Sequence, residues 1–202
     1  MVIRSENSSQ NVSFRARLRR ERIASRDGMA AEARARADAA IESRLFELLG
    51  ARAPGLIAFC WPVRSEFDAR PLMARLLAQG WRACLPVVEQ SASPMVFRAW
   101  VPGAAMGTDR HGIPIPADGE PCRPDVILLP LVAFDRQGYR LGYGGGYFDR
   151  TLAALRPRPW TIGVGYELGR VDSIRPEPHD VPLDLCVTEA GIGGPGLNRL
   201  EP

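Results

Sequence analysis

A glycine-rich segment in the second half of the chain has the residue types of an anion-binding site. Four glycines occupy five positions, Gly142 and residues 144–146. Glycine lets a backbone turn sharply and bring its N–H groups close to a ligand, and a following helix N-terminus adds partial positive charge. Arg140 before the loop and Asp149 after it add a guanidinium for phosphate and a candidate Mg²⁺ ligand. A tight turn that binds nothing is the alternative interpretation.

A second group of candidate residues lies near the N-terminus, where residues 13–26 predict a helix with Ser13 as its N-cap. Arg15, Arg19, Arg22 and Arg26 recur at i, i+4, i+7 and i+11, so they lie on one helix face. Such a stripe is usually a solvated face, and this is the interpretation we keep for Arg22 and Arg26.

Composition excludes several large enzyme classes. All 26 basic residues are arginine, which excludes a lysine Schiff base and the P-loop lysine. Two histidines leave no HExxH or three-histidine zinc site, and no GxSxG nucleophile motif occurs. The net charge of +3 is too small to indicate nucleic acid, and the longest apolar run, residues 126–134, is too short to span a bilayer. Four cysteines without a CxxC pair are typical of a reduced, intracellular protein.

The elements that must position these residues alternate along the chain. Strands are predicted at residues 56–61, 82–87, 95–100, 125–129, 161–165 and 185–188, with helices at 29–49, 70–79 and 149–155. Gly50 is expected to cap the helix before it, and residues 102–124 are expected to be loop. Strands separated by helices predict an α/β fold, a layered and mostly parallel sheet flanked by helices with an N-terminal helical segment. We expect one domain over residues 13–192, a disordered tail at 1–12 and a C-terminal tail at 193–202.

Four segments of the chain resemble one known family. Residues 131–149, LVAFDRQGYRLGYGGGYFD, are similar to the signature of the 5-formyltetrahydrofolate cyclo-ligases, also called 5,10-methenyltetrahydrofolate synthetases. The other three are residues 15–19, residues 61–68, and residues 177–180 followed by Asp184 and residues 187–189. They occur in the order of the family. The resemblance implies an enzyme that phosphorylates the formyl oxygen of 5-formyltetrahydrofolate with ATP and closes the ring with release of ADP and phosphate.

The resemblance also implies roles for individual residues. Arg140 and Tyr147 are the expected catalytic residues, and Asp149 and Asp180 the expected Mg²⁺ ligands. The folate substrate is expected to contact Trp61, Glu66, Tyr147 and Trp100, with Glu66 accepting hydrogen bonds from the pterin ring. The expected ATP-binding residues are Arg15, Arg19, Arg140, Leu141, Gly142, Tyr143, Gly144, Gly145, Gly146, Tyr147 and Phe148.

The chain departs from the family pattern at four positions. Arg15 stands where the family usually has lysine, and Ala69 where it has threonine. Some members carry arginine at the Tyr143 position and lysine at the Gly145 position. The loop is therefore expected to depend more on backbone N–H groups, Mg²⁺ and arginines from elsewhere. We expect His111 to be structural and His179 at most to orient a neighbour.

Two alternatives stay open. One is a diverged relative that keeps the ATP site but acts on another substrate. The other is a nucleic-acid-binding module led by the arginine-rich helix; Glu21, Asp27 and Glu32 interrupt its charge, and no aromatic platform accompanies it. Against these, we expect a cytoplasmic monomer whose partners are reduced folate and ATP, with neither nucleic acid nor membrane.

Overall fold

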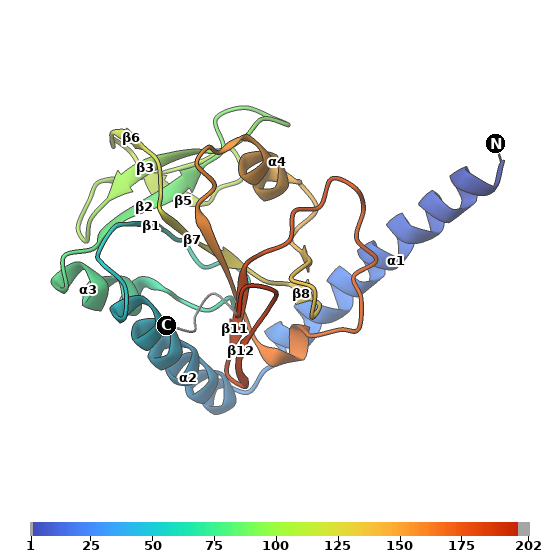
Figure 1. Ribbon diagram of the computed structural model, residues 1–202, viewed down its shortest axis with the longest axis horizontal. Helices are drawn as coiled ribbons and strands as arrows, with labels where there is room; N and C mark the ends of the chain where they lie inside the picture. The colour runs from blue at the N-terminus through green and yellow to red at the C-terminus, as the bar shows by residue number, and fades with distance from the viewer. Residues whose placement is uncertain (1, 198–202) are drawn as a thin grey trace.

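The computed structural model describes residues 2–197, and Figure 1 shows a central sheet with helices on both sides. The strands of this eight-stranded sheet run in the order β12-β11-β10-β7-β1-β2-β3-β6. The five strands from β11 to β2 are parallel, whereas β12, β3 and β6 are antiparallel to their neighbours. The predicted mostly parallel α/β sheet is confirmed.

The strands of the main sheet are β1 (Leu56–Ala58), β2 (Arg82–Val87), β3 (Val96–Trp100), β6 (Pro121–Cys122), β7 (Val126–Pro130), β10 (Trp160–Val164), β11 (Leu185–Thr188) and β12 (Gly191–Gly193). Two small antiparallel pairs accompany it. One joins β4 (Met106–Thr108) to β5 (Pro114–Pro116), and the other joins β8 (Ala133–Phe134) to β9 (Arg140–Leu141). The helices are α1 (Val2–Asp27), α2 (Ala31–Gly50), α3 (Arg70–Ala78) and α4 (Tyr147–Ala154), with a short 3-10 helix η1 (Glu167–Gly169).

The core has two layers because successive side chains of a strand point to opposite faces. In β7, Val126 and Leu128 join the cluster that packs against α2 and α3, whereas Ile127 and Leu129 join the cluster beneath α4. Figure 1 shows α2 and α3 on one side of the sheet and α4 on the other. Burial on both faces explains why β7 is a continuous apolar run rather than an alternating one.

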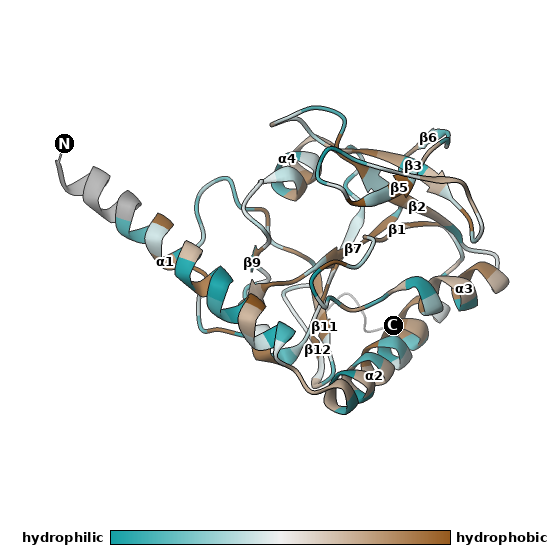
Figure 2. Ribbon diagram, turned by 180° about the vertical axis from the view of Figure 1, so that it is seen from behind, coloured by the Kyte–Doolittle hydropathy of each residue, from teal (hydrophilic) through white to brown (hydrophobic). Residues whose placement is uncertain are grey.

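The N-terminal helix differs from the prediction. Its helical backbone begins at Val2 and so includes residues 2–12 of the expected tail, and Ser13 lies inside the helix rather than at its N-cap. A serine marks a helix start only where an apolar periodic pattern begins directly after it. Without a clear pattern, a serine at the start of a helix cannot be told from a serine inside it. In Figure 2, brown apolar and teal polar residues are mixed along the part of α1 that carries the hydropathy colours.

Other boundaries also differ. The expected loop at residues 102–124 contains β4, β5 and β6, and β8, β9 and β12 were not predicted. Helix α2 ends at Gly50 itself, and Ala51 is the C-cap. Helix α4 begins at Tyr147, so Asp149 lies in its first turn. Residues 198–202 of the expected C-terminal tail lie outside the described residues, and the domain boundaries remain predictions. Over residues 2–197, no helix is long and apolar enough to cross a membrane.

Candidate active site

The glycine-rich loop connects β9 to α4, and its backbone conformation requires glycine. Gly144 and Gly146 have φ angles of +98° and +65°, in the left-handed region that other residues disfavour. A Cβ on Gly145 would lie 2.8 Å from the ring of Tyr147. Arg19 on α1 donates from Nε to the Gly142 carbonyl at 2.7 Å. The structure therefore brings Arg19, on the arginine face of α1, against this loop, and its contact with ATP remains a prediction.

One turn away on α1, Arg15 forms a two-pronged ion pair with Asp180. Its Nη1 and Nη2 atoms lie 2.7 and 3.0 Å from the Asp180 carboxylate, which also accepts the backbone N–H of Glu177 at 2.7 Å. Burial acts to raise the pKa of Asp180, but the Arg15 and Glu177 hydrogen bonds outweigh it and hold the pKa below its usual value. Arg15 and the expected metal ligand Asp180 are thus direct partners.

Asp149 and Arg140 form the second ion pair of the site. Arg140 Nη2 lies 3.2 Å from Asp149 Oδ1, and Arg140 Nη1 donates to the Val181 carbonyl at 2.8 Å. The N–H of Val181 donates to the same Asp149 oxygen at 3.0 Å. Burial lowers the pKa of the Arg140 guanidinium, and the nearby Asp149 carboxylate opposes that shift. The segment that contains Asp180 and Val181 therefore joins both carboxylates into one network.

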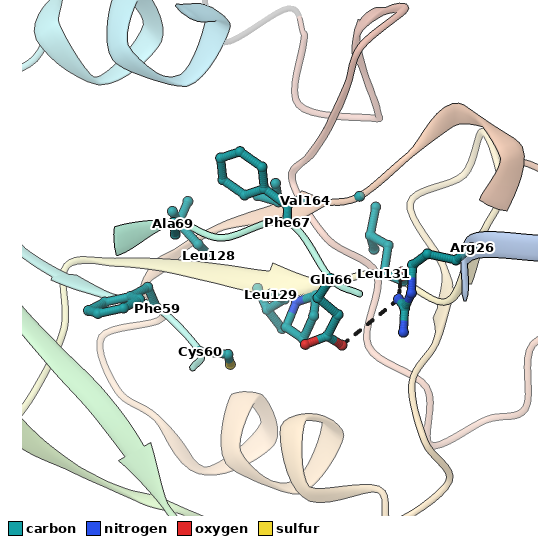
Figure 3. A pocket seen from close by; sticks show the side chains of 12 residues that line it. Arg26, Phe59, Cys60, Glu66, Phe67, Ala69, Leu128, Leu129, Leu131 and Val164 are labelled. Atoms are coloured by element: carbon teal, nitrogen blue, oxygen red, sulfur yellow. Dashed lines mark hydrogen bonds and ion pairs between the residues drawn. The ribbon is translucent and has the colours of Figure 1, made fainter. Parts of the chain in front are cut away.

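A pocket opens at the carboxyl ends of β1, β7 and β10 (Figure 3), and the Tyr143 hydroxyl of the glycine-rich loop donates to Glu66 in its wall at 2.7 Å. Such crevices are where open α/β sheets bind ligands. Its polar groups come from Arg26 and Glu66, and the surrounding apolar wall includes Phe59 and Leu129. Burial raises the pKa of Glu66, although hydrogen bonds from the Tyr143 hydroxyl and the Val63 N–H oppose the shift.

Arg26 corrects the sequence-based interpretation of the helix stripe. It is 3% exposed rather than solvated, and its Nη2 donates to the Tyr143 hydroxyl at 2.6 Å. Arg22 is half-buried and donates to the Leu168 carbonyl at 3.0 Å. The helix period correctly places the four arginines on one face, but it does not show that this face packs against the protein.

Tyr147 has a partner that sequence reasoning missed. His111, at the tip of the hairpin formed by β4 and β5, places Nε2 3.2 Å from the Tyr147 hydroxyl, with the ring centroids 5.5 Å apart. The Arg150 guanidinium lies 5.0 Å from the centroid of the same ring. His111 therefore reaches the start of α4, directly after the glycine-rich loop, although it stands 36 positions from Tyr147 and no local pattern marks it.

The remaining predicted site residues differ in their burial and in their distance from the pocket. Leu141 is buried, and Phe148 is half-buried with its ring centroid 6.0 Å from the Arg140 guanidinium. Trp61 is half-buried, and its ring centroid lies 6.4 Å from that of Trp100. Trp100 packs edge-on against Phe59 in the core and does not line the pocket. Its role in substrate binding therefore remains a prediction.

The family model that describes the 5-formyltetrahydrofolate cyclo-ligase family matches residues 10–189. The chain belongs to the 5-formyltetrahydrofolate cyclo-ligase family. All the predicted site residues of this family member, from Arg15 to Asp180, lie inside the matched region. The resemblance that the sequence motifs indicated is confirmed.

Individual relatives agree with this membership. The family member is 35% identical over 134 residues to the 5-formyltetrahydrofolate cyclo-ligase of Escherichia coli K12, covering 63% of this chain and 74% of that protein. It is 29% identical over 185 residues to the Haemophilus influenzae cyclo-ligase, covering 88% of this chain and 99% of that protein.

Solved structures agree as well. The 5,10-methenyltetrahydrofolate synthetase of Aquifex aeolicus superimposes with a TM-score of 0.77 and 29% identity, covering 90% of this cyclo-ligase family member and 92% of that chain. The synthetase from Mycoplasma pneumoniae gives a TM-score of 0.69 and 25% identity, covering 87% of this chain and 98% of that chain.

Proposed function

We propose that this protein catalyses the ATP-dependent cyclisation of 5-formyltetrahydrofolate to 5,10-methenyltetrahydrofolate, with release of ADP and phosphate. One observation carries the proposal beyond family membership. The arginine face of α1, the glycine-rich loop and two aspartates meet beside a pocket that contains a buried carboxylate. This arrangement supports an anion-binding site next to a site for a ring with N–H donors.

The chemistry explains why both sites are needed. The formyl oxygen belongs to an amide and leaves poorly, so transfer of the γ-phosphoryl group of ATP to that oxygen turns it into a phosphate leaving group. Nitrogen 10 of the folate then attacks the formyl carbon, loses its proton and expels phosphate. Phosphoryl transfer of this kind depends on positioning and on positive charge rather than on a protein nucleophile. We assign that charge to Arg19 and Arg140 and to the N–H groups of the loop.

Mg²⁺ is part of the proposal, with Asp149 and Asp180 as its protein ligands. Mg²⁺ in phosphoryl-transfer sites commonly binds one or two carboxylates, with phosphates and water completing its shell. Among residues 10–197, no group of three or more metal-binding side chains could hold a cation alone, which suits a metal that arrives with ATP. The contacts of Asp149 to Arg140 and Val181 both use Oδ1, so we expect Oδ2 to face the cation. When bound, Mg²⁺ would neutralise charge on the phosphates.

The pocket supplies the folate side of the proposal. Glu66 accepts hydrogen bonds through Oε1 from Tyr143 and through Oε2 from Val63, and a carboxylate has further lone pairs for the N–H donors of a pterin. We assign Tyr147 to the junction of the two substrates, because it follows the glycine-rich loop directly. Trp61 is assigned to the outer edge of the folate site.

The proposal is tested by absorbance. The purified protein with Mg²⁺, ATP and 5-formyltetrahydrofolate should form the methenyl chromophore, because ring closure extends conjugation through the new iminium. Omission of ATP is the matched control and should abolish the signal. Binding of ATP without any chromophore at saturating folate would favour the diverged relative that acts on another substrate. The monomeric state and the cytoplasmic location stay predictions.

A further inference from the structure

Arg26 is buried at the junction between the glycine-rich loop and the pocket, and the proposed chemistry assigns it no role. Its guanidinium contacts three separate segments of the chain. Nε donates to the Arg64 carbonyl at 3.0 Å, Nη1 to the Leu131 carbonyl at 3.3 Å, and Nη2 to the Tyr143 hydroxyl at 2.6 Å. These segments are the turn before Glu66, the residue that follows β7 and the glycine-rich loop.

The Tyr143 hydroxyl continues this contact to Glu66. It accepts from Arg26 and donates to Glu66 Oε1 at 2.7 Å, while Arg26 Nη1 lies 3.9 Å from the same carboxylate oxygen. Figure 3 shows the Arg26 and Glu66 side chains approaching one another from different elements. Both side chains are about 5% exposed or less. Buried opposite charges depend strongly on each other, so a displacement of one alters the position of the other.

The turn before Glu66 gives a second, independent observation. Arg64 and Ser65 have φ angles of 47° and 60°, so two successive residues other than glycine adopt the left-handed conformation. That conformation is unfavourable for L-residues and persists where surrounding contacts hold it. The hydrogen bond from Arg26 Nε to the Arg64 carbonyl is one such contact. Glu66 follows Ser65 directly, so a contact that holds this turn also bears on the position of Glu66.

We infer that Arg26 and Tyr143 are positioning residues that couple nucleotide binding at the glycine-rich loop to folate binding at Glu66. This inference rests on the proposed function. A nucleotide that orders the loop also fixes the Tyr143 hydroxyl against Glu66, so the carboxylate is already oriented when folate arrives. Folate that orders Glu66 has the reciprocal effect on the loop. Each ligand therefore binds more tightly when the other is present.

The test is calorimetric titration of 5-formyltetrahydrofolate and of a non-hydrolysable ATP analogue with Mg²⁺, each alone and each with the other saturating. In the wild-type protein we expect the analogue to tighten folate binding about tenfold, with the same factor in the reverse titration. Tyr143→Phe keeps the ring but removes the bridging hydroxyl. It should bring the coupling factor, which is the ratio of each Kd without and with the other ligand, to within about twofold of one.

Two further variants keep the outcome decisive. Arg26→Gln should lose the coupling and also weaken folate binding. Arg22→Gln is the matched control, because Arg22 lies on the same helix face but donates to the Leu168 carbonyl, and it should keep the full coupling factor. Independent binding of the two ligands to the wild type, or full coupling in Tyr143→Phe, would overturn the inference but would leave the proposed function standing. No folate binding by the wild type would overturn the proposed function, and the inference with it.

Discussion

The ion pair between Arg15 and Asp180 makes a quantitative prediction about stability. The Arg15 side chain is 10% exposed and that of Asp180 4%, so truncation of the arginine leaves a buried carboxylate without its main partner. Breaking a fully buried pair costs about 3–5 kcal/mol. The Glu177 N–H still donates to Asp180, so we expect Arg15→Ala to lose about 2–3 kcal/mol of unfolding free energy. For a chain of this size, this lowers Tm by about 5–10 °C.

A double-mutant cycle separates this pair from general damage to α1. Urea unfolding would be measured for the wild type, Arg15→Ala, Asp180→Asn and the double variant at about pH 7, and the coupling energy should exceed about 1 kcal/mol. Arg17→Ala is the control, because the Arg17 side chain on the same helix is 65% exposed and should change stability by less than about 0.5 kcal/mol. A coupling energy near zero would refute the reasoning.

The pH dependence of the same cycle has a definite sign. The pKa of Asp180 is lower in the folded protein than its ordinary value of 3.8. The ionised carboxylate therefore stabilises the fold above about pH 4, and that contribution is lost as the pH falls through the lowered pKa. The coupling energy should be constant near neutral pH and should decrease only in the acid range. Coupling that increases on acidification would contradict the assignment.

Three further predictions concern other parts of the site. Asp149→Asn should raise the Mg²⁺ concentration needed for turnover and lower kcat by about 100-fold; unchanged kinetics with a lower Tm would make Asp149 purely structural. Gly146→Ala should cost about 1–2 kcal/mol in thermal unfolding and raise the KM for ATP, because the φ of Gly146 is +65° and a Cβ would lie 2.8 Å from Arg150 Nη1. Burial raises the pKa of Glu66 in the folded protein. The protonated Glu66 carboxyl therefore contributes fully to the free energy of unfolding below the pKa that Glu66 has in the unfolded chain, and this contribution is lost as the pH rises through its pKa in the folded protein. Glu66→Gln should therefore gain stability relative to the wild type as pH rises over that range, in denaturation curves, while its folate affinity falls; a stability difference independent of pH would show that burial does not control this carboxylate.

The sheet could be predicted because its central strands are buried on both faces. The apolar run of β7 and the helix periodicity of α2 and α3 both come from contact with one core, so each is visible in the sequence. The strands β4, β5 and β6 are two or three residues long in a segment rich in proline and glycine. Strands this short have no alternation to detect, and their pairing depends on tertiary contacts.

The candidate site likewise has one part that is visible in the sequence and one part that is not. Roles for the residues of the glycine-rich segment could be proposed from local pattern, because these residues lie close together in the sequence. The helix period placed Arg26 on the same face as Arg19 but could not show that Arg26 is buried, because burial depends on Glu66 and Tyr143, which are distant in sequence. His111 reaches Tyr147 through a hairpin that leaves no signal in either segment. Partners brought together by topology require the three-dimensional structure.

The most direct test of the central claim measures chromophore and ADP in the same reaction. With 5-formyltetrahydrofolate, ATP and Mg²⁺, the proposed function predicts one ADP for each molecule of 5,10-methenyltetrahydrofolate formed, with neither product in the absence of the other substrate. Equal rates of ADP formation and of chromophore formation over a range of folate concentrations would show that phosphoryl transfer is coupled to ring closure. Formation of ADP without chromophore, or of chromophore without ATP, would contradict the claim.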